Sequence, residues 1–148
     1  MTITIKTNEL TFSICETFYD EVGAIASELT SVREAGVLTE SEFERAVLSA
    51  DAAVRASQTR FLAEYGTGSA SNEQTLGESL EYVFVGSQRK YYGRESVIAR
   101  CIADVLKDLV LAEIFKPLNA ELASIHAKYG VEALAELTSI LIIKRPPM

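Results

Sequence analysis

Residues 94–115 read RESVIARCIADVLKDLVLAEIF and form the most apolar helical pattern in the chain. Apolar side chains recur nearly all round the helical period, so only a narrow polar face remains. A helix with that pattern must be covered from several sides. We therefore predict that 94–115 is the central helix of a mainly α fold. Its apolar positions are Ile98, Cys101, Ile102, Val105, Leu106, Leu109, Val110, Leu111 and Ile114.

Two long helices are predicted before this segment, at 14–35 and 39–65. The first begins at a capping-box pattern, Ser13 with Glu16, and the second begins at a similar pattern from Thr39. Apolar residues then follow at alternating spacings of three and four, which is typical of an amphipathic helix. The short connection between the two helices favours an antiparallel pair.

Shorter elements complete a predicted bundle of about five helices. A short helix is expected at 75–85. Pro117 interrupts the helical pattern after the central segment. We predict that the next helix runs from 118 to 129 and ends at Gly130, since glycine suits the residue after a helix end. A last helix is expected at 132–138.

The first thirteen residues alternate between apolar and polar side chains, which predicts a β-hairpin at 1–13. A two-residue turn at 7–8 would bring the apolar side chains of both arms to one face. A helix that starts near Asn8 is the alternative. The β-branched segment SILII, at 139–143, is a candidate for an extra strand beside this hairpin.

Length and composition limit the class of protein. A chain of 148 residues suits one domain, so we predict a single helical domain over 1–143 and a flexible tail at 144–148. The hydrophobic fraction of 48% is typical of a globular protein. The two cysteines lie in apolar helical patterns and are expected to be reduced. With no signal sequence and no membrane-spanning run, a cytoplasmic location is predicted.

The net charge of −7 is unevenly distributed along the chain. Residues 1–83 contain fourteen acidic and five basic residues, whereas residues 97–148 contain six of each. Because an acidic chain repels nucleic acid and anionic membranes, we expect neither as a direct partner. The segment GSQRKYYGRES, at 86–96, is the one local excess of positive charge.

This basic segment is the predicted partner-binding region. Cationic and aromatic side chains are the types that anchor protein interfaces. The residues concerned are Arg89, Lys90, Tyr91, Tyr92 and Arg94. The alternative is that the segment only connects two elements, while its basic side chains pair with the acidic helices of the same chain.

The sequence contains no motif of catalytic strength, and we predict no catalytic, metal-binding or cofactor-binding residue. The single histidine, His126, is placed by its pattern near the end of a helix, where a positive charge suits the helix dipole. Acid–base chemistry could use the carboxylate pairs 20–21 and 104–108. On amphipathic helices, however, such acids usually form a solvated face.

These observations favour a non-enzymatic protein that interacts or assembles through its helical surfaces. A homo-oligomer is expected because the apolar stripes exceed what one hairpin can cover. Two alternatives stay open. An acidic inhibitor would occupy the basic groove of a nucleic-acid-handling partner. A small enzyme or ligand-binding protein would have a site that the sequence does not reveal.

Overall fold

The computed structural model describes residues 1–25, 40–62, 77–85 and 94–142. The fold is mainly helical with a two-stranded antiparallel sheet that begins at the N-terminus, and the predicted fold class is confirmed. One turn of 3-10 helix, Thr59–Phe61, follows the second of the described α-helices. The elements are β1 (Thr2–Lys6), α1 (Thr7–Ile25), α3 (Glu40–Ser57), β2 (Ser79–Val83), α4 (Glu95–Phe115) and α5 (Ala120–Leu141).

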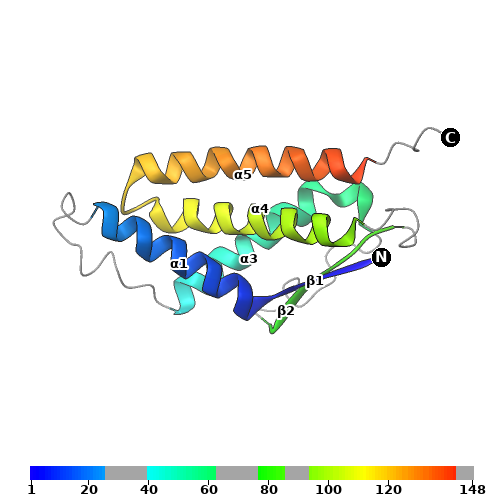
Figure 1. Ribbon diagram of the computed structural model, residues 1–148, viewed down its shortest axis with the longest axis horizontal. Coiled ribbons are helices and arrows are strands. Elements are labelled where there is room, and N and C mark those ends of the chain that lie inside the picture. Colours follow the sequence, from blue (N-terminus) through cyan, green and yellow to red (C-terminus); the bar gives the residue numbers. More distant parts are fainter. Residues whose placement is uncertain (26–39, 63–76, 86–93, 143–148) are drawn as a thin grey trace.

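Helix α4 is central, as its composition predicts. It contacts α5, α3, α1 and β1. Figure 1 shows α5 along one side of α4, with α1 and α3 on the other. Each buried aliphatic side chain contributes about 1.5–3 kcal/mol on leaving water, so α4 is the main source of core stability. Its buried residues are Ile98, Cys101, Ile102, Val105, Leu106, Val110, Leu111 and Phe115.

The connection between α4 and α5 is short, and it contains Pro117 as expected for a helix break. Asn119 then caps α5, because its side chain accepts a hydrogen bond from the backbone N–H of Leu122 at 3.0 Å. The short connection makes the two helices antiparallel neighbours, which Figure 1 shows side by side.

The predicted helix end at Gly130 is wrong, because α5 runs without interruption to Leu141. The predictions of a separate helix at 132–138 and a strand at 139–143 therefore fail as well. Gly130 lies where α4 and α5 come close together. A Cβ atom at this position would be 2.8 Å from Cδ2 of Leu109. Glycine serves close helix packing here, rather than termination of the helix.

The antiparallel sheet joins β1 to β2, so the predicted hairpin at 1–13 has the wrong second strand. Ile3 lies opposite Tyr82 and Ile5 opposite Leu80. After β1 the chain enters α1 directly, which agrees with the alternative of a helix near Asn8. The second arm of the predicted hairpin is helical because a helical repeat of apolar residues overlaps the alternating pattern there. Its buried residues recur every four positions: Leu10, Ile14, Phe18 and Val22.

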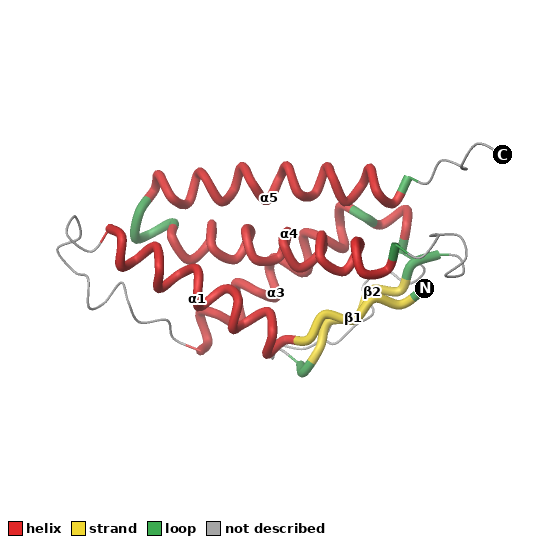
Figure 2. The backbone as a smooth tube through the Cα atoms, viewed as in Figure 1, coloured by secondary structure: helices red, strands yellow, loops and turns green. Residues whose placement is uncertain are grey.

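Strand β2 occupies the segment predicted as a short helix at 75–85, so that prediction is wrong. Its buried and exposed side chains alternate, with Leu80 and Tyr82 facing the core. Two hydrogen bonds from Thr7 connect the sheet to α1: the backbone N–H donates to Glu78 at 3.0 Å, and the hydroxyl donates to Gly77 at 2.8 Å. Figure 2 shows β1 continuing into the first turn of α1, with β2 alongside β1.

None of the helices in the described ranges is both long enough and apolar enough to cross a membrane.

Candidate functional site

The predicted partner-binding segment is only partly covered by the structure. Arg89, Lys90, Tyr91 and Tyr92 lie outside the described residues. Arg94 is described, is exposed, and precedes the first turn of α4, where its carbonyl accepts a hydrogen bond from Ile98 at 2.9 Å. The binding role of the segment stays a prediction.

A groove of about 280 Å³ lies between β1 and the start of α1 on one side and α4 on the other. Ile5 and Leu10 line it from the first side. Ala99 and Ala103 line it from α4, one helical turn apart. Small side chains at these two positions leave space that larger ones would fill. The volume is at the low end for a ligand site, and it suits a small molecule or one partner side chain.

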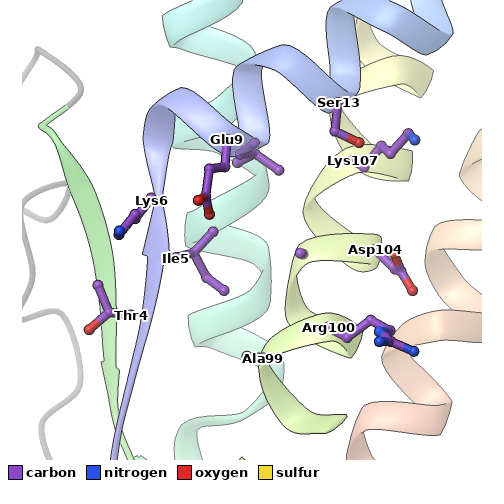
Figure 3. Close-up of a pocket in the computed structure, with 11 residues that line it drawn as sticks. Thr4, Ile5, Lys6, Glu9, Ser13, Ala99, Arg100, Asp104 and Lys107 are labelled. Carbon is purple, nitrogen blue, oxygen red and sulfur yellow. The ribbon is translucent and has the colours of Figure 1, made fainter. Parts of the chain in front are cut away.

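Charged side chains of both signs surround this groove. Figure 3 shows the carboxylate of Glu9 directed between β1–α1 and α4, whereas Lys6 projects away from α4. Arg100 and Asp104 project from the other side of α4. Burial, reinforced by the nearby Asp108, raises the pKa of Asp104. The groove therefore offers an apolar floor with one carboxylate directed over it.

Three of the eight large apolar side chains that are exposed in the described residues belong to α5, and a fourth, Ile142, directly follows it. Val131 is 65% exposed and Ile142 is 47% exposed. These two lie eleven positions apart, so they share one flank of the helix. Ile125 and Tyr129 lie on the opposite flank. Between the flanks runs a charged ridge that consists of Glu121, Lys128, Glu132 and Glu136.

The flank that contains Val131 is free of charge along the full length of α5. It combines exposed small residues with two larger apolar ones, and it is hereafter called the uncharged flank. Its exposed members are Ala120, Ser124, Ala127, Val131 and Ala135, with Ile142 directly after the helix, whereas Thr138 is half-buried and accepts a hydrogen bond from Gln58. Single exposed apolar residues are normal on a protein surface, but an aligned set along one helix is the pattern of an interaction surface.

His126 is the centre of a buried polar cluster, and its predicted place near a helix end is wrong. It lies in α5, well before Leu141. Its Nε2 is 2.9 Å from both carboxylate oxygens of Glu21 in α1, and its Nδ1 is 3.1 Å from Oδ1 of Asp108 in α4. The ring is stacked on Phe115, with centroids 5.9 Å apart. Both ring nitrogens are engaged, so neither is open to a substrate or metal ion.

A second buried polar cluster connects α3 to the sheet. Nε of Arg55 donates to Oδ2 of Asp51 at 2.9 Å, and its Nη2 donates to the carbonyl of Glu81 at 2.8 Å. The hydroxyl of Tyr82 donates to the other oxygen of Asp51. Burial, followed by the charge of Asp51, raises the pKa of Tyr82 well above its usual value, so the phenol stays a donor. This cluster holds β2 against α3.

Gln58, beyond the end of α3, has a polar atom that the described residues leave unsatisfied. Its amide nitrogen donates to the hydroxyl of Thr138 in α5 at 3.0 Å. Its Oε1 is buried and has no partner among the described residues. Within the same residues, no group of three or more histidine, cysteine, aspartate or glutamate side chains is arranged to hold a metal ion.

The sequence singled out the members of the histidine cluster separately. His126 is the one histidine of the sequence, and Glu21 and Asp108 each belong to a carboxylate pair. No local pattern joins residues that are 105 positions apart, as Glu21 and His126 are. Comparisons of the chain with protein-family models, with curated proteins and with solved structures gave no match. The chemistry of the residues themselves is the remaining guide to function.

Proposed function

We propose that this protein is an interaction module that binds a protein partner, or a second copy of itself, through its helical surfaces. The observation that carries the proposal is the uncharged flank of α5, which continues for the whole helix and includes the exposed Val131 and Ile142. Covering these side chains would remove apolar area from water at about 25 cal/mol per Å².

The packing of α5 supports the choice of this helix. Among the described elements its main contacts are with α4, and Figure 1 places it at the edge of the bundle. A helix at an edge can bury a second face only against another molecule or another part of the chain. The charged ridge beside the flank would form the polar rim that protein interfaces have around their apolar centres.

A matched pair of variants tests this proposal. Val131→Glu places a charge on the uncharged flank, whereas Ser139→Glu places the same charge on the ridge side of the same helix. Both positions are exposed, so both variants should fold. We expect Val131→Glu to weaken self-association or partner binding by about tenfold or more, and Ser139→Glu to have little effect. Sedimentation equilibrium measures the first, and affinity capture with quantified prey measures the second. Equal behaviour of the two variants would contradict the proposal.

The basic segment is proposed as a second contact region of the same module. Changing Arg89, Lys90 and Arg94 to glutamate, and separately Tyr91 and Tyr92 to alanine, should weaken association with little effect on the melting temperature. If both variants assemble like the parent and capture the same prey, the segment is only a connection.

Ligand binding is a second candidate function, and the groove beside Ala99 and Ala103 favours it. An apolar floor with the Glu9 carboxylate above it would suit a small apolar group that carries an ammonium. Benzylamine is a suitable probe, with benzyl alcohol as the uncharged control. We expect benzylamine to shift the NMR signals of the Ala99 and Ala103 methyl groups. Ala103→Leu should abolish the effect, and equal shifts with benzyl alcohol would contradict the role of Glu9.

A further inference from the structure

Three helices meet at His126. Its Nε2 faces Glu21 of α1, its Nδ1 faces Asp108 of α4, and the histidine itself belongs to α5. We propose that His126 is a proton-dependent latch that fixes the second half of α1 to the α4–α5 pair. The proposal is independent of what the surfaces of the protein bind.

The arrangement of hydrogen-bonding groups indicates which form of the ring fits. A neutral imidazole has one N–H and one lone pair, whereas an imidazolium has two N–H donors. Ionised Glu21 and Asp108 can only accept hydrogen bonds. Only the imidazolium can therefore satisfy both carboxylates, at 2.9 Å and 3.1 Å. In the neutral form, one carboxylate would face a ring lone pair.

Burial makes this mismatch costly. The side chain of His126 is 8% exposed, and those of Glu21 and Asp108 are 27% and 22% exposed. Water can reach the carboxylates in part, but it has little access to the ring. Hydrogen bonds between ionised groups are roughly twice as strong as neutral ones. Loss of one ring proton thus removes a strong hydrogen bond and leaves a ring nitrogen lone pair facing a negatively charged carboxylate oxygen.

The aromatic neighbours of the ring limit how it can adjust. The ring of His126 lies parallel to that of Phe115, at an interplanar angle of 8°. Phe115 in turn contacts Phe18 of α1, with ring centroids 5.2 Å apart. The ring of Tyr129 is nearly perpendicular to that of His126, with centroids 6.4 Å apart. Stacking of this kind holds the plane of the ring, so the carboxylates have to move when a proton leaves.

The charged groups that face the ring are carboxylates. From α1 the facing group is Glu21, and from α4 it is Asp108. Asp104, one turn before Asp108, is a further carboxylate on α4, and burial together with the charge of Asp108 raises its pKa. From α5 the aromatic Tyr129 is the neighbour. Within the described residues, the ring of His126 contacts the two carboxylates and the aromatic rings of Phe115 and Tyr129.

The expected consequence is a change in how firmly α1 is held. The imidazolium bridges α1 to α4 through Glu21 and Asp108. As pH rises and the ring loses a proton, Nε2 or Nδ1 no longer donates, and the second half of α1 is free to separate from α4 and α5. The first half stays attached by its hydrogen bonds to the β2 side, where Thr7 donates to Glu78.

The test uses the full chain labelled at histidine, in which one histidine gives one unambiguous set of ring signals. Ring ¹⁵N shifts and amide hydrogen exchange are followed from about pH 5 to about pH 9. We expect both ring nitrogens to carry protons at the acidic end. Loss of one proton should coincide with exchange of the 18–25 amides that is about 10–100-fold faster, after correction for the intrinsic rate. Amides of α3 are the internal reference.

Two variants separate the latch from a simple structural contact. Glu21→Gln carries both a donor and an acceptor, so it can pair with a neutral ring, and α1 exchange should lose its dependence on pH. Asp20→Asn, at the adjacent exposed acid, should behave like the parent. A ring that holds a single neutral tautomer in the parent, or α1 exchange that does not change with its titration, would overturn the proposal. Because these two readouts come from the parent protein, they stand even where a variant fails to fold.

Discussion

Asp51→Asn should lower the free energy of unfolding by ~3–5 kcal/mol, the cost of breaking a buried ion pair by removing one partner. The side chains of Arg55 and Asp51 are 5% and 1% exposed, with Nε and Oδ2 2.9 Å apart. Asparagine has nearly the same shape as aspartate, so packing hardly changes. What changes is that the buried guanidinium of Arg55 loses its ion pair with Asp51.

The remaining contacts of Arg55 place the expected loss toward the lower end of this range. Its Nη2 still donates to the carbonyl of Glu81, and its guanidinium lies over the ring of Tyr82, 4.5 Å from the centroid. A cation above an aromatic face is stabilised by about 0.5–2 kcal/mol. The amide oxygen of asparagine can also accept from the Tyr82 hydroxyl or from Arg55. We therefore expect a loss of about 3 kcal/mol.

Urea unfolding followed by far-UV circular dichroism is a suitable assay, because the chain is rich in helix and has no tryptophan. Asp20→Asn is the matched control, since Asp20 is exposed on α1, and its effect should be within about 0.5 kcal/mol. Arg55→Met, alone and combined with Asp51→Asn, completes a double-mutant cycle with a coupling of about 1–3 kcal/mol. A loss below about 1 kcal/mol for Asp51→Asn, or single effects that simply add, would refute this reasoning.

Three other variants or conditions test separate features of the fold. Gly130→Leu should separate α4 from α5 and destabilise the protein by ~1–3 kcal/mol. Gly23→Ala, where an added Cβ meets nothing within 4 Å, should instead stabilise it by ~0.5–1 kcal/mol. Thermal melts compare the two variants, and melting temperatures that shift in the same direction would show that the close approach at Gly130 is mistaken. Burial raises the pKa of Cys101 to about 11, so iodoacetamide near neutral pH should alkylate it about a hundredfold or more slowly in the folded than in the unfolded protein, and mass spectrometry that finds similar rates would contradict burial. Burial and Asp108 raise the pKa of Asp104, so its ionised form opposes folding above that pKa and the effect disappears as pH falls. Asp104→Asn should accordingly raise the melting temperature at neutral pH and change it little in acid, and a lower melting temperature at neutral pH would count against this account.

The central helix could be predicted from sequence because its signal is local and complete. The residues of α4 are apolar nearly all round, and Pro117 marks its end. Gly130 shows where local reasoning fails. A glycine at the end of a helix and a glycine between two helices look the same in sequence, and only the position of Leu109 distinguishes them.

The sheet was predicted only in part, for a related reason. β1 has a clear alternation, but its partner β2 lies far along the chain, whereas the alternation of the adjacent residues predicts a local hairpin. The alternation of Leu80, Tyr82 and Phe84 with Glu81 and Val83 was present as a signal for β2. It was hidden by leucines whose spacing also fits a short helix.

The candidate sites depend on contacts between distant residues, so the sequence could name their members without joining them. His126 and Asp108 are 18 positions apart and belong to different helices. The groove likewise needs Ala99 and Ala103 to face β1, which follows from how α4 is oriented in the bundle. The basic segment, by contrast, was conspicuous in sequence, and most of it lies outside the described residues.

The pairing of β1 with β2 has a consequence for the order in which the nascent protein can fold. Ile5 pairs with Leu80, so β1 leaves the ribosome 75 residues before its partner. At about 5–20 residues per second, this delay is roughly 4–15 seconds. α4, which covers the apolar face of α1, is made later still. β1 and α1 are thus synthesised well before the elements that cover them, and during that interval their apolar residues are accessible to chaperones.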